Sequence, residues 1–151
     1  MTMKTLVFDM DGTLADTYGV DGWLKMLRAE DPTPYIKAKP IYDMAILTAI
    51  LWVLKNDGWR IAITSWLAKS STPIYDAKVR QAKIDWLRRY DFPYDELHIV
   101  EYGTVKETCT KDLGGFQILI DDDDRVRKDW TLGDAIDAKQ NIIPFLSGLI
   151  A

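Results

Sequence analysis

The protein chain contains 151 residues, of which 48% are hydrophobic and 28% are charged. This composition is typical of one soluble globular domain and excludes the disordered and fibrous classes of protein. The net charge of -4 argues against a protein that coats nucleic acid, because such a protein would carry a basic surface.

Residues 4–56 are predicted to contain one strand and two helices. Residues 4–8 form an apolar run that predicts a buried strand, and residues 22–30 are predicted to form a short amphipathic helix. Residues 31–40 contain three prolines and are therefore expected to form a loop. Residues 42–56 predict a helix that starts near Asp43 and ends before Gly58.

This second helix is apolar on all of its faces. It is expected to be buried in the core or under a partner, and the core is the favoured interpretation. Its longest near-apolar stretch, residues 44–54, is well short of the roughly 20 residues that a membrane span needs. The sequence therefore predicts no contact with a membrane.

From residue 59 onward, the chain is predicted to alternate between strands and helices. Thr72 and Pro73 are typical of the N-cap and the first position of a helix. Asp124 is a candidate cap for a helical turn that follows a run of four aspartates. The predicted strands are 59–64, 97–100, 116–120 and, weakly, 135–137; the predicted helices are 72–90, 104–113 and 141–148.

The alternation of strands and helices predicts an α/β fold with a doubly wound, mainly parallel, Rossmann-like sheet in a single domain, residues 1–151. Parallel sheets bind ligands at the carboxyl ends of their strands. Three predicted strands end in residues whose carboxylates or hydroxyls could bind a ligand or react with it: Asp9, Thr64-Ser65 and Asp121-Asp122. This coincidence is stronger evidence for a site than any single motif.

Acidic residues are distributed unevenly by type, because 19 of the 23 are aspartates and four are glutamates. Aspartate is favoured at helix caps, turns, metal sites and nucleophile positions. Cys109 is the only cysteine, so no disulfide can form within the chain, and a reducing, cytoplasmic compartment is expected.

The first motif is Asp9-Met10-Asp11-Gly12-Thr13-Leu14. Residues two apart on an extended segment point the same way, so Asp9 and Asp11 can face one reacting group. Gly12 allows a sharp turn and a close approach to a ligand. The alternative interpretation is a strand followed by an ordinary Asp-Gly turn.

The second motif is Thr64-Ser65 at a strand end. Its hydroxyls and backbone amides can bind the oxygens of a phosphate. The alternative interpretation is an ordinary loop, in which both residues are common. A lysine can neutralise a phosphoryl group together with a carboxylate. We expect Lys106 in this role, because it lies near the start of a helix that begins at the carboxyl edge of the sheet. The competing lysines are Lys78, Lys83 and Lys111. Lys83 is placed in mid-helix and is expected to lie farther away. Lys111 lies at the far end of its helix.

After the two motifs and the lysine, the fourth feature is the pair Asp121-Asp122 at the end of an apolar strand. Two neighbouring carboxylates repel each other unless a cation lies between them. Mg²⁺ prefers oxygen ligands and needs only one or two carboxylates in addition to a substrate phosphate. The sequence thus predicts a Mg²⁺ site here, whereas Asp123 and Asp124 are expected to be solvated.

These motifs, in this order, resemble those of the haloacid dehalogenase superfamily over nearly the whole chain. The resemblance implies that Asp9 is a nucleophile that forms an aspartyl-phosphate. It implies that Asp11 protonates the leaving oxygen and then activates water, while its backbone carbonyl helps to hold Mg²⁺. An aspartate two residues after the nucleophile marks the phosphatases and phosphotransferases of that superfamily.

The same resemblance assigns the remaining motif residues. Thr64 and Lys106 match the hydroxyl and the lysine that bind the phosphoryl group, and Asp121 and Asp122 complete the Mg²⁺ site. The expected activity is therefore that of a Mg²⁺-dependent phosphomonoesterase.

The expected substrate follows from a small cap-like insertion around residues 17–40. A small cap resembles that of the 5'(3')-deoxyribonucleotidases and of the phosphatase domain of polynucleotide kinase-phosphatases, so a nucleotide or a nucleic-acid terminal phosphate is expected. Trp66 and Tyr18 are candidate contacts to a nucleobase, on which aromatic rings can stack.

Other functions stay open at this stage. The substrate could instead be a sugar phosphate or a phosphoprotein, and the chain could be a non-catalytic phosphoacceptor. The order of the motifs argues against a receiver of the response-regulator kind, because the third strand ends in Val100-Glu101 without an aspartate. The oligomeric state is not predicted.

Overall fold

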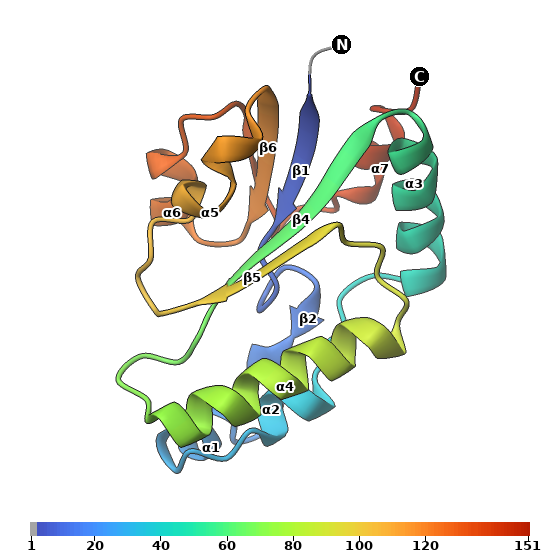
Figure 1. The fold of residues 1–151 in the computed structure, drawn as a ribbon. Coiled ribbons are helices and arrows are strands. Elements are labelled where there is room, and N and C mark those ends of the chain that lie inside the picture. The colour runs from blue at the N-terminus through green and yellow to red at the C-terminus, as the bar shows by residue number, and fades with distance from the viewer. Residues whose placement is uncertain (1–2) are drawn as a thin grey trace.

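Five parallel strands form the central sheet of the computed structural model, which describes residues 3–151 (Figure 1). Their order across the sheet is β5-β4-β1-β6-β7, and every neighbouring pair is parallel. The predicted α/β class is confirmed, with helices on both faces as in a Rossmann-like fold. The strands are β1 (Lys4–Phe8), β4 (Trp59–Trp66), β5 (Glu96–Val100), β6 (Phe116–Asp121) and β7 (Ala135–Asp137).

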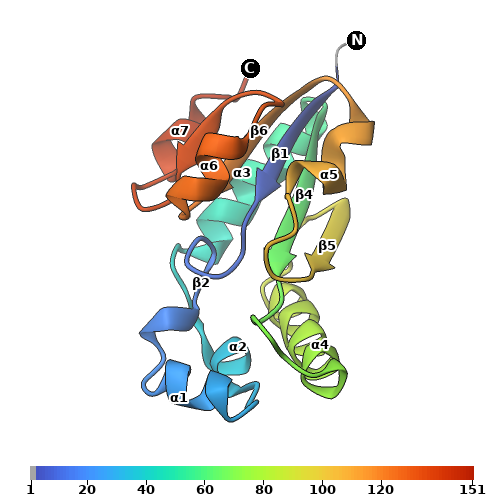
Figure 2. The same ribbon diagram turned by 90° about the vertical axis from the view of Figure 1, so that its left-hand side faces the viewer.

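The two faces of the sheet are covered by different helices (Figure 2). Helices α3 (Met44–Asn56) and α7 (Ile143–Ser147) pack on one face. Helix α6 (Asp124–Asp129) packs on the other face, beside α5 (Glu107–Thr110) and the 3-10 turn η2 (Lys111–Leu113). Alternate residues of β1, β4 and β6 therefore enter two separate apolar clusters.

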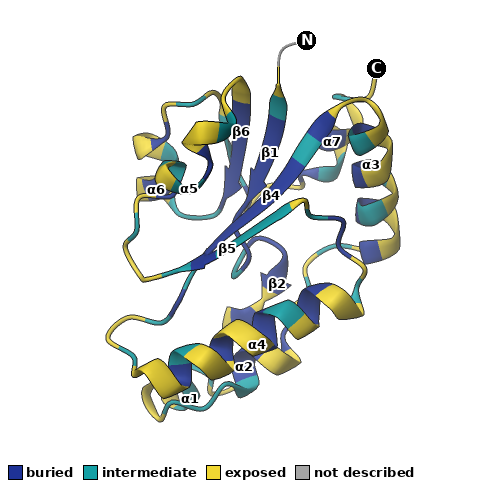
Figure 3. Cartoon of the chain, in the orientation of Figure 1, coloured by how far each residue is buried: buried dark blue, intermediate teal, exposed yellow. Residues whose placement is uncertain are grey.

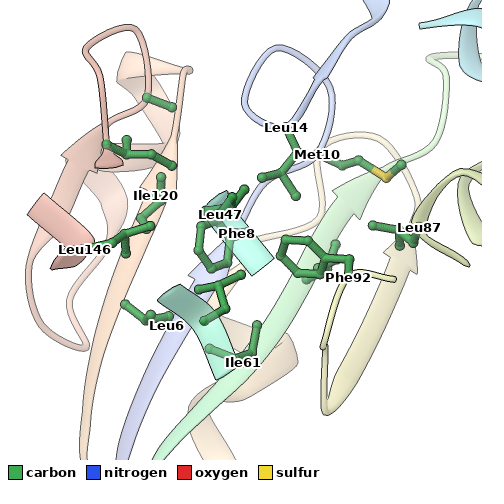
Figure 4. Close-up of a cluster of buried hydrophobic side chains, with 14 of the residues drawn as sticks. Leu6, Phe8, Met10, Leu14, Leu47, Ile61, Leu87, Phe92, Ile120 and Leu146 are labelled. Atoms are coloured by element: carbon green, nitrogen blue, oxygen red, sulfur yellow. The ribbon is translucent and has the colours of Figure 1, made fainter. Parts of the chain in front are cut away.

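The larger cluster lies between the sheet and helices α3 and α7 (Figure 4). Phe8 from β1 meets Phe92 edge-on, with 5.6 Å between the ring centroids. Strands buried on both faces need continuous apolar runs, and this requirement explains the sequence of β1, β4 and β6. The cluster includes Leu6, Phe8, Leu47, Leu51, Ile61, Ile63, Ile118, Ile120 and Leu146.

A further layer lies beyond the carboxyl ends of the strands (Figure 1). It consists of helix α4 (Pro73–Arg89) and the insertion, by which we mean residues 17–40. Strands β2 (Ala15–Asp16) and β3 (Lys39–Pro40) pair antiparallel and close the base of the insertion. The insertion contains the 3-10 turn η1 (Thr17–Gly19), α1 (Trp23–Arg28) and α2 (Thr33–Lys37), and α2 packs on α4.

The prediction that residues 31–40 form a loop is wrong, because α2 and β3 occupy most of this segment. Pro32 and Pro34 lie at the start of α2, where a helix has no internal partner for the backbone N–H groups and proline is tolerated. Asp31 supplies an acceptor to the N–H of Thr33 at 2.9 Å.

Two predictions about helix starts also need correction. The chain is still turning at Gly103 and Thr104, so a regular helix begins only at Glu107. The cap of α6 is Asp123, which accepts from the N–H of Arg125 at 2.9 Å, and not Asp124. By contrast, the predicted caps Asp43 and Thr72 are confirmed, because their side chains accept from N–H groups in the first turns of α3 and α4.

Helix α3 is buried along one stripe only, which includes Leu47, Leu51 and Leu54. The expectation that the whole helix lies in the core is wrong, because Ile46 and Trp52 on its outer side are about half exposed (Figure 3). Within residues 3–151, no helix combines the length and the apolar character needed to cross a membrane.

Candidate functional site

Three carboxylates from two strand ends meet at the carboxyl edge of the sheet. Asp9 follows β1, and Asp121 and Asp122 come from the end of neighbouring β6. One oxygen of each carboxylate lies within 4.8 Å of the other two, and Asp9 and Asp121 are buried. Adjacent parallel strands end at one edge, so residues 112 positions apart in sequence become neighbours.

Lys106 bridges two of these three carboxylates. Its Nζ donates to Asp9 Oδ1 at 2.8 Å and to Asp121 Oδ2 at 2.7 Å, and the lysine is only 4% exposed. Burial alone would lower the pKa of Lys106, but the two carboxylates outweigh burial and raise it, so this side chain is a permanent cation. Burial would raise the pKa of Asp9, but the charge of Lys106 and the hydrogen bonds with Asp122, Lys106 and Thr13 together hold this pKa below its ordinary value.

The pKa values of the other two carboxylates, Asp121 and Asp122, are raised instead of lowered. Burial, followed by the charge of Asp9, raises the pKa of Asp121 to about 6. Burial, followed by a hydrogen bond with Asp9, raises the pKa of Asp122 to about 8. The cluster therefore carries more negative charge than Lys106 neutralises, and Asp122 is the carboxylate with the greatest need of a further cation.

The loop after Asp9 brings the backbone close to Asp122. Gly12 has a φ of 81°, and a Cβ at this position would lie 2.3 Å from Asp122 Oδ2. Only glycine fits both the left-handed conformation and the space. Thr13 fixes the other side of the nucleophile candidate, because its hydroxyl donates to Asp9 Oδ2 at 3.0 Å.

Asp11 lies beside this cluster, and its side chain is held by two donors. Thr17 Oγ1 donates to Asp11 Oδ1 at 2.6 Å, and Lys83 Nζ donates to Asp11 Oδ2 at 2.8 Å. Thr17 belongs to the insertion and Lys83 to α4, so Asp11 joins the sheet to the outer layer. The side chain of Asp11 is not among the three grouped carboxylates.

The expectation that Lys83 lies far from the site is wrong. Helix α4 crosses the carboxyl edge of the sheet instead of running back along one face, so the middle of the helix reaches the site (Figure 1). Lys83 is fully buried and also donates to Ser65 Oγ at 2.7 Å and to the carbonyl of Trp66 at 2.8 Å. Lys78 and Lys111 are exposed.

The sequence contains a signal that would have found Lys83. The buried stripe of α4 includes Val79 and Trp86, and Lys83 lies four residues after the first and three before the second. That spacing places the lysine on the buried face of the helix. A lysine at such a position needs polar partners, and the site provides them.

Thr64 and Ser65 are both fully buried at the end of β4. Phe8 pairs with Ile63, so Thr64 lies at the level of Asp9 on the neighbouring strand. Among residues 3–151, the hydroxyl of Thr64 has no hydrogen-bond partner, whereas Ser65 accepts from Lys83. A buried hydroxyl of this kind next to the acidic cluster is free to donate to a phosphate oxygen.

A cavity of about 380 Å³ opens above these residues, between the sheet edge and the insertion. Asp9, Asp11, Lys106, Asp121 and Asp122 line its polar end. Its other walls are mostly apolar and aromatic, and they include Tyr18, Trp23, Leu27, Tyr35, Trp66, Leu67 and Tyr102, with Lys69 as a further cation.

Both candidate substrate contacts line this cavity. Tyr18 is half exposed and packs edge-on against Trp23, with 4.9 Å between the ring centroids. Trp66 is fixed by a hydrogen bond from Nε1 to the carbonyl of Thr104 at 2.9 Å. Tyr35, which the sequence also places among the aromatic residues near the predicted mouth, lines the cavity too, and its ring lies 5.2 Å from Lys83 Nζ.

Comparison with protein-family models gives no match for this chain, and comparison with curated proteins gives none either.

Proposed function

We propose that this protein is a phosphomonoesterase of the haloacid dehalogenase type, with Asp9 as the nucleophile. The observation that carries the proposal is the position of Asp9. Its carboxylate lies at the polar end of the cavity, ion-paired to Lys106 and grouped with Asp121 and Asp122. A buried carboxylate, a fixed cation and further acidic ligands are the groups that attack on a phosphoryl group requires.

The donor set fits Mg²⁺. All three grouped side chains offer carboxylate oxygens, which Mg²⁺ prefers. Burial, followed by the hydrogen bond and the charge of Asp9, raises the pKa of Asp122, and a bound cation would oppose this effect. Asp9 and Asp122 would hold the ion together with Asp121, whose Oδ2 is already engaged by Lys106. When bound, a divalent cation supplies neutralisation of the phosphoryl oxygens and the nucleophile.

In the first half of the proposed reaction, an oxygen of Asp9 attacks phosphorus and the bond from phosphorus to the ester oxygen breaks. Lys106 and Thr13 hold the two oxygens of Asp9, so the orientation of the carboxylate is fixed before the substrate arrives. Asp11 leaves its ion pair with Lys83, takes up a proton from solvent and gives that proton to the departing alkoxide. Asp11 has to turn from Lys83 toward the leaving oxygen to do so.

In the second half, Asp11 takes a proton from a water molecule, and the water oxygen attacks phosphorus. The bond between phosphorus and Asp9 breaks, which releases inorganic phosphate and restores the carboxylate. Splitting one displacement into two steps is the advantage of a covalent intermediate. Asp11 then releases this proton to solvent and returns as a carboxylate to Lys83 and Thr17, which completes the cycle.

The cavity walls support a substrate with a ring system beyond its phosphate. Tyr18, Trp23, Trp66 and Tyr102 offer aromatic faces or edges near the polar end, and Lys69 adds a positive charge. Nucleotides and nucleic-acid ends have the flat bases that stack on such rings. A simple sugar phosphate would leave these apolar walls without a partner.

The test is phosphate release with Mg²⁺ present from 5'- and 3'-mononucleotides, end-phosphorylated oligonucleotides, sugar phosphates and phosphopeptides. We expect release from the nucleotide group. Asp9→Asn should abolish release, whereas the matched change Asp112→Asn, at an exposed position, should not.

Activity confined to sugar phosphates or phosphopeptides would contradict the proposed substrate. A long-lived phosphoaspartate without release would instead indicate a phosphoacceptor.

A further inference from the structure

The outer side of helix α3 is an apolar surface that lies away from the catalytic site. We define the α3 outer face as Ala45, Ile46, Ala49, Trp52 and Val53, all of which are exposed. At about 100° per residue, these positions lie opposite the buried stripe of the same helix. Ile46 is 51% exposed, Trp52 52% and Val53 41%, which is a high exposure for three large apolar side chains on one helix.

The surface continues beyond both ends of the helix. Ile41 precedes α3 and is 40% exposed, and Ile150 is 38% exposed. Ile150 lies near the other end of α3, because the following N–H, that of Ala151, donates to Asp57 Oδ2 at 3.2 Å. The apolar strip, by which we mean the α3 outer face with Ile41 and Ile150, is flanked by Lys55, whose Nζ lies 4.8 Å from the centroid of the Trp52 ring. Several exposed, large apolar side chains on one helix are a typical feature of a protein–protein interface.

The side chains of this strip are arranged symmetrically about Ala49. Ala45 and Val53 lie four residues to either side of it, and Ile46 and Trp52 lie three residues to either side. If a two-fold axis passed through Ala49, two antiparallel α3 helices would place Ile46 of each copy against Trp52 of the other. The small side chains at 45 and 49 would let the helix backbones approach closely.

The charges at the helix ends have the same symmetry. Asp43 caps the N-terminus of α3 and Lys55 lies in its last turn, each six residues from Ala49. An antiparallel pair brings the acidic end of one helix to the basic end of the other and also opposes the helix dipoles. Lys55 keeps its own partner Asp95 at 3.0 Å, so this contact would set the direction of pairing more than its strength.

We infer that the occupant of the α3 outer face is a second copy of this chain, packed antiparallel about a two-fold axis at Ala49. Self-complementarity in size and charge is what an isologous interface requires, and an unrelated partner would not need it. The strip supplies on the order of 400 Å² of apolar surface per copy. Together with the polar residues around the strip, the two copies would bury about 1,000 Å² in total. An interface of this area is at the weak end of specific protein–protein interfaces.

The experiment measures the mass of the full chain in solution by sedimentation equilibrium from about 1 μM to 1 mM, the range in which a small interface associates. We expect the mass to rise from 17.3 kDa toward twice that value. Val53→Glu should remove the association, whereas Ile74→Glu should not, because Ile74 is an equally apolar, 73% exposed residue on α4.

Cysteine cross-linking tests the register in a Cys109→Ser background. Ala49→Cys lies on the proposed axis and should form a disulfide-linked dimer. Asn56→Cys should not, because two copies of residue 56 would lie about 21 Å apart at 1.5 Å per residue.

A constant mass of 17.3 kDa, or equal association of the two glutamate variants, would overturn the dimer. Cross-linking at residue 56 but not at residue 49 would overturn the proposed register. Circular dichroism of the glutamate variants separates lost association from lost folding.

Discussion

Lys83 Nζ lies 2.8 Å from Asp11 Oδ2, although the two residues are 72 positions apart in sequence. The contact joins the acid–base candidate to helix α4 in the layer that covers the site. Because Lys83 is fully buried, it has no alternative partner in solvent. The position of the Asp11 carboxylate therefore depends on a helix outside the sheet.

Replacement of Lys83 by methionine should reduce turnover and stability together. The change keeps the size of the side chain but removes three hydrogen bonds and leaves Asp11 without its cation. We expect a loss of about 100-fold in kcat and of about 3 kcal/mol in the free energy of unfolding. Steady-state kinetics and urea unfolding measure the two effects. Lys78→Met, an exposed change on the same helix, is the control, and equal losses in the two variants would contradict the assignment.

The choice among the lysines after β5 can be tested with a pair of alanine variants. Lys106→Ala leaves Asp9 and Asp121 buried without their shared cation, so we expect phosphate release to fall by 100-fold or more, on the order found for loss of one charge-stabilising group. Lys111→Ala changes an exposed side chain and should leave the rate nearly unchanged. A greater loss in Lys111→Ala than in Lys106→Ala would refute the role given to Lys106.

Stability should depend on pH when divalent cations are removed with EDTA. The pKa of Asp122 is about 8 in the folded protein against an ordinary value of 3.8, so the folded state holds its proton more tightly. The resulting stability is fully present below the ordinary pKa and is lost as the pH rises through about 8. The midpoint of thermal unfolding should fall over this range and recover with Mg²⁺. In Asp122→Asn both the fall and the recovery should be much smaller, and an unchanged response to Mg²⁺ would exclude Asp122 as a ligand.

Gly12→Ala should disturb the acidic cluster more than an equivalent change elsewhere. Gly12 and Gly114 both have positive φ angles, 81° and 70°, but a Cβ at Gly114 has nothing within 4 Å. Gly114→Ala should therefore cost only the backbone strain of about 1–3 kcal/mol. Gly12→Ala adds a clash with Asp122 and should weaken Mg²⁺ binding, measured by titration calorimetry. Equal effects of the two changes on Mg²⁺ binding would show that the close approach at Gly12 is unimportant.

Much of the local structure was predictable because it depends on neighbours in sequence. Apolar runs bounded by turn residues predicted the parallel strands, and Asp43 and Thr72 were identified as helix caps from their positions. The position of Lys106 at the carboxyl edge followed from the direction of a helix between parallel strands. The error at Asp124 was a shift of one residue, because β6 extends to Asp121 and the helix starts directly after Asp123.

The excess of aspartate is partly explained by two kinds of position, helix caps and the acidic cluster. Asp43 and Asp123 cap helices, while Asp9, Asp121 and Asp122 form the acidic cluster and Asp11 lies beside it. In each role a short side chain keeps the carboxylate close to its own backbone.

What only the tertiary structure decided is where the long elements lie relative to the sheet. Local pattern specifies that residues 73–89 form a helix, but the direction of that helix depends on its packing against α2 and on contacts such as Trp86 Nε1 with the carbonyl of Ala38 at 2.8 Å. That direction brings Lys83 to Asp11. In the same way, the apolar sequence of α3 could not show which of its faces meets the sheet, because burial is a property of the packed chain and not of the helix alone.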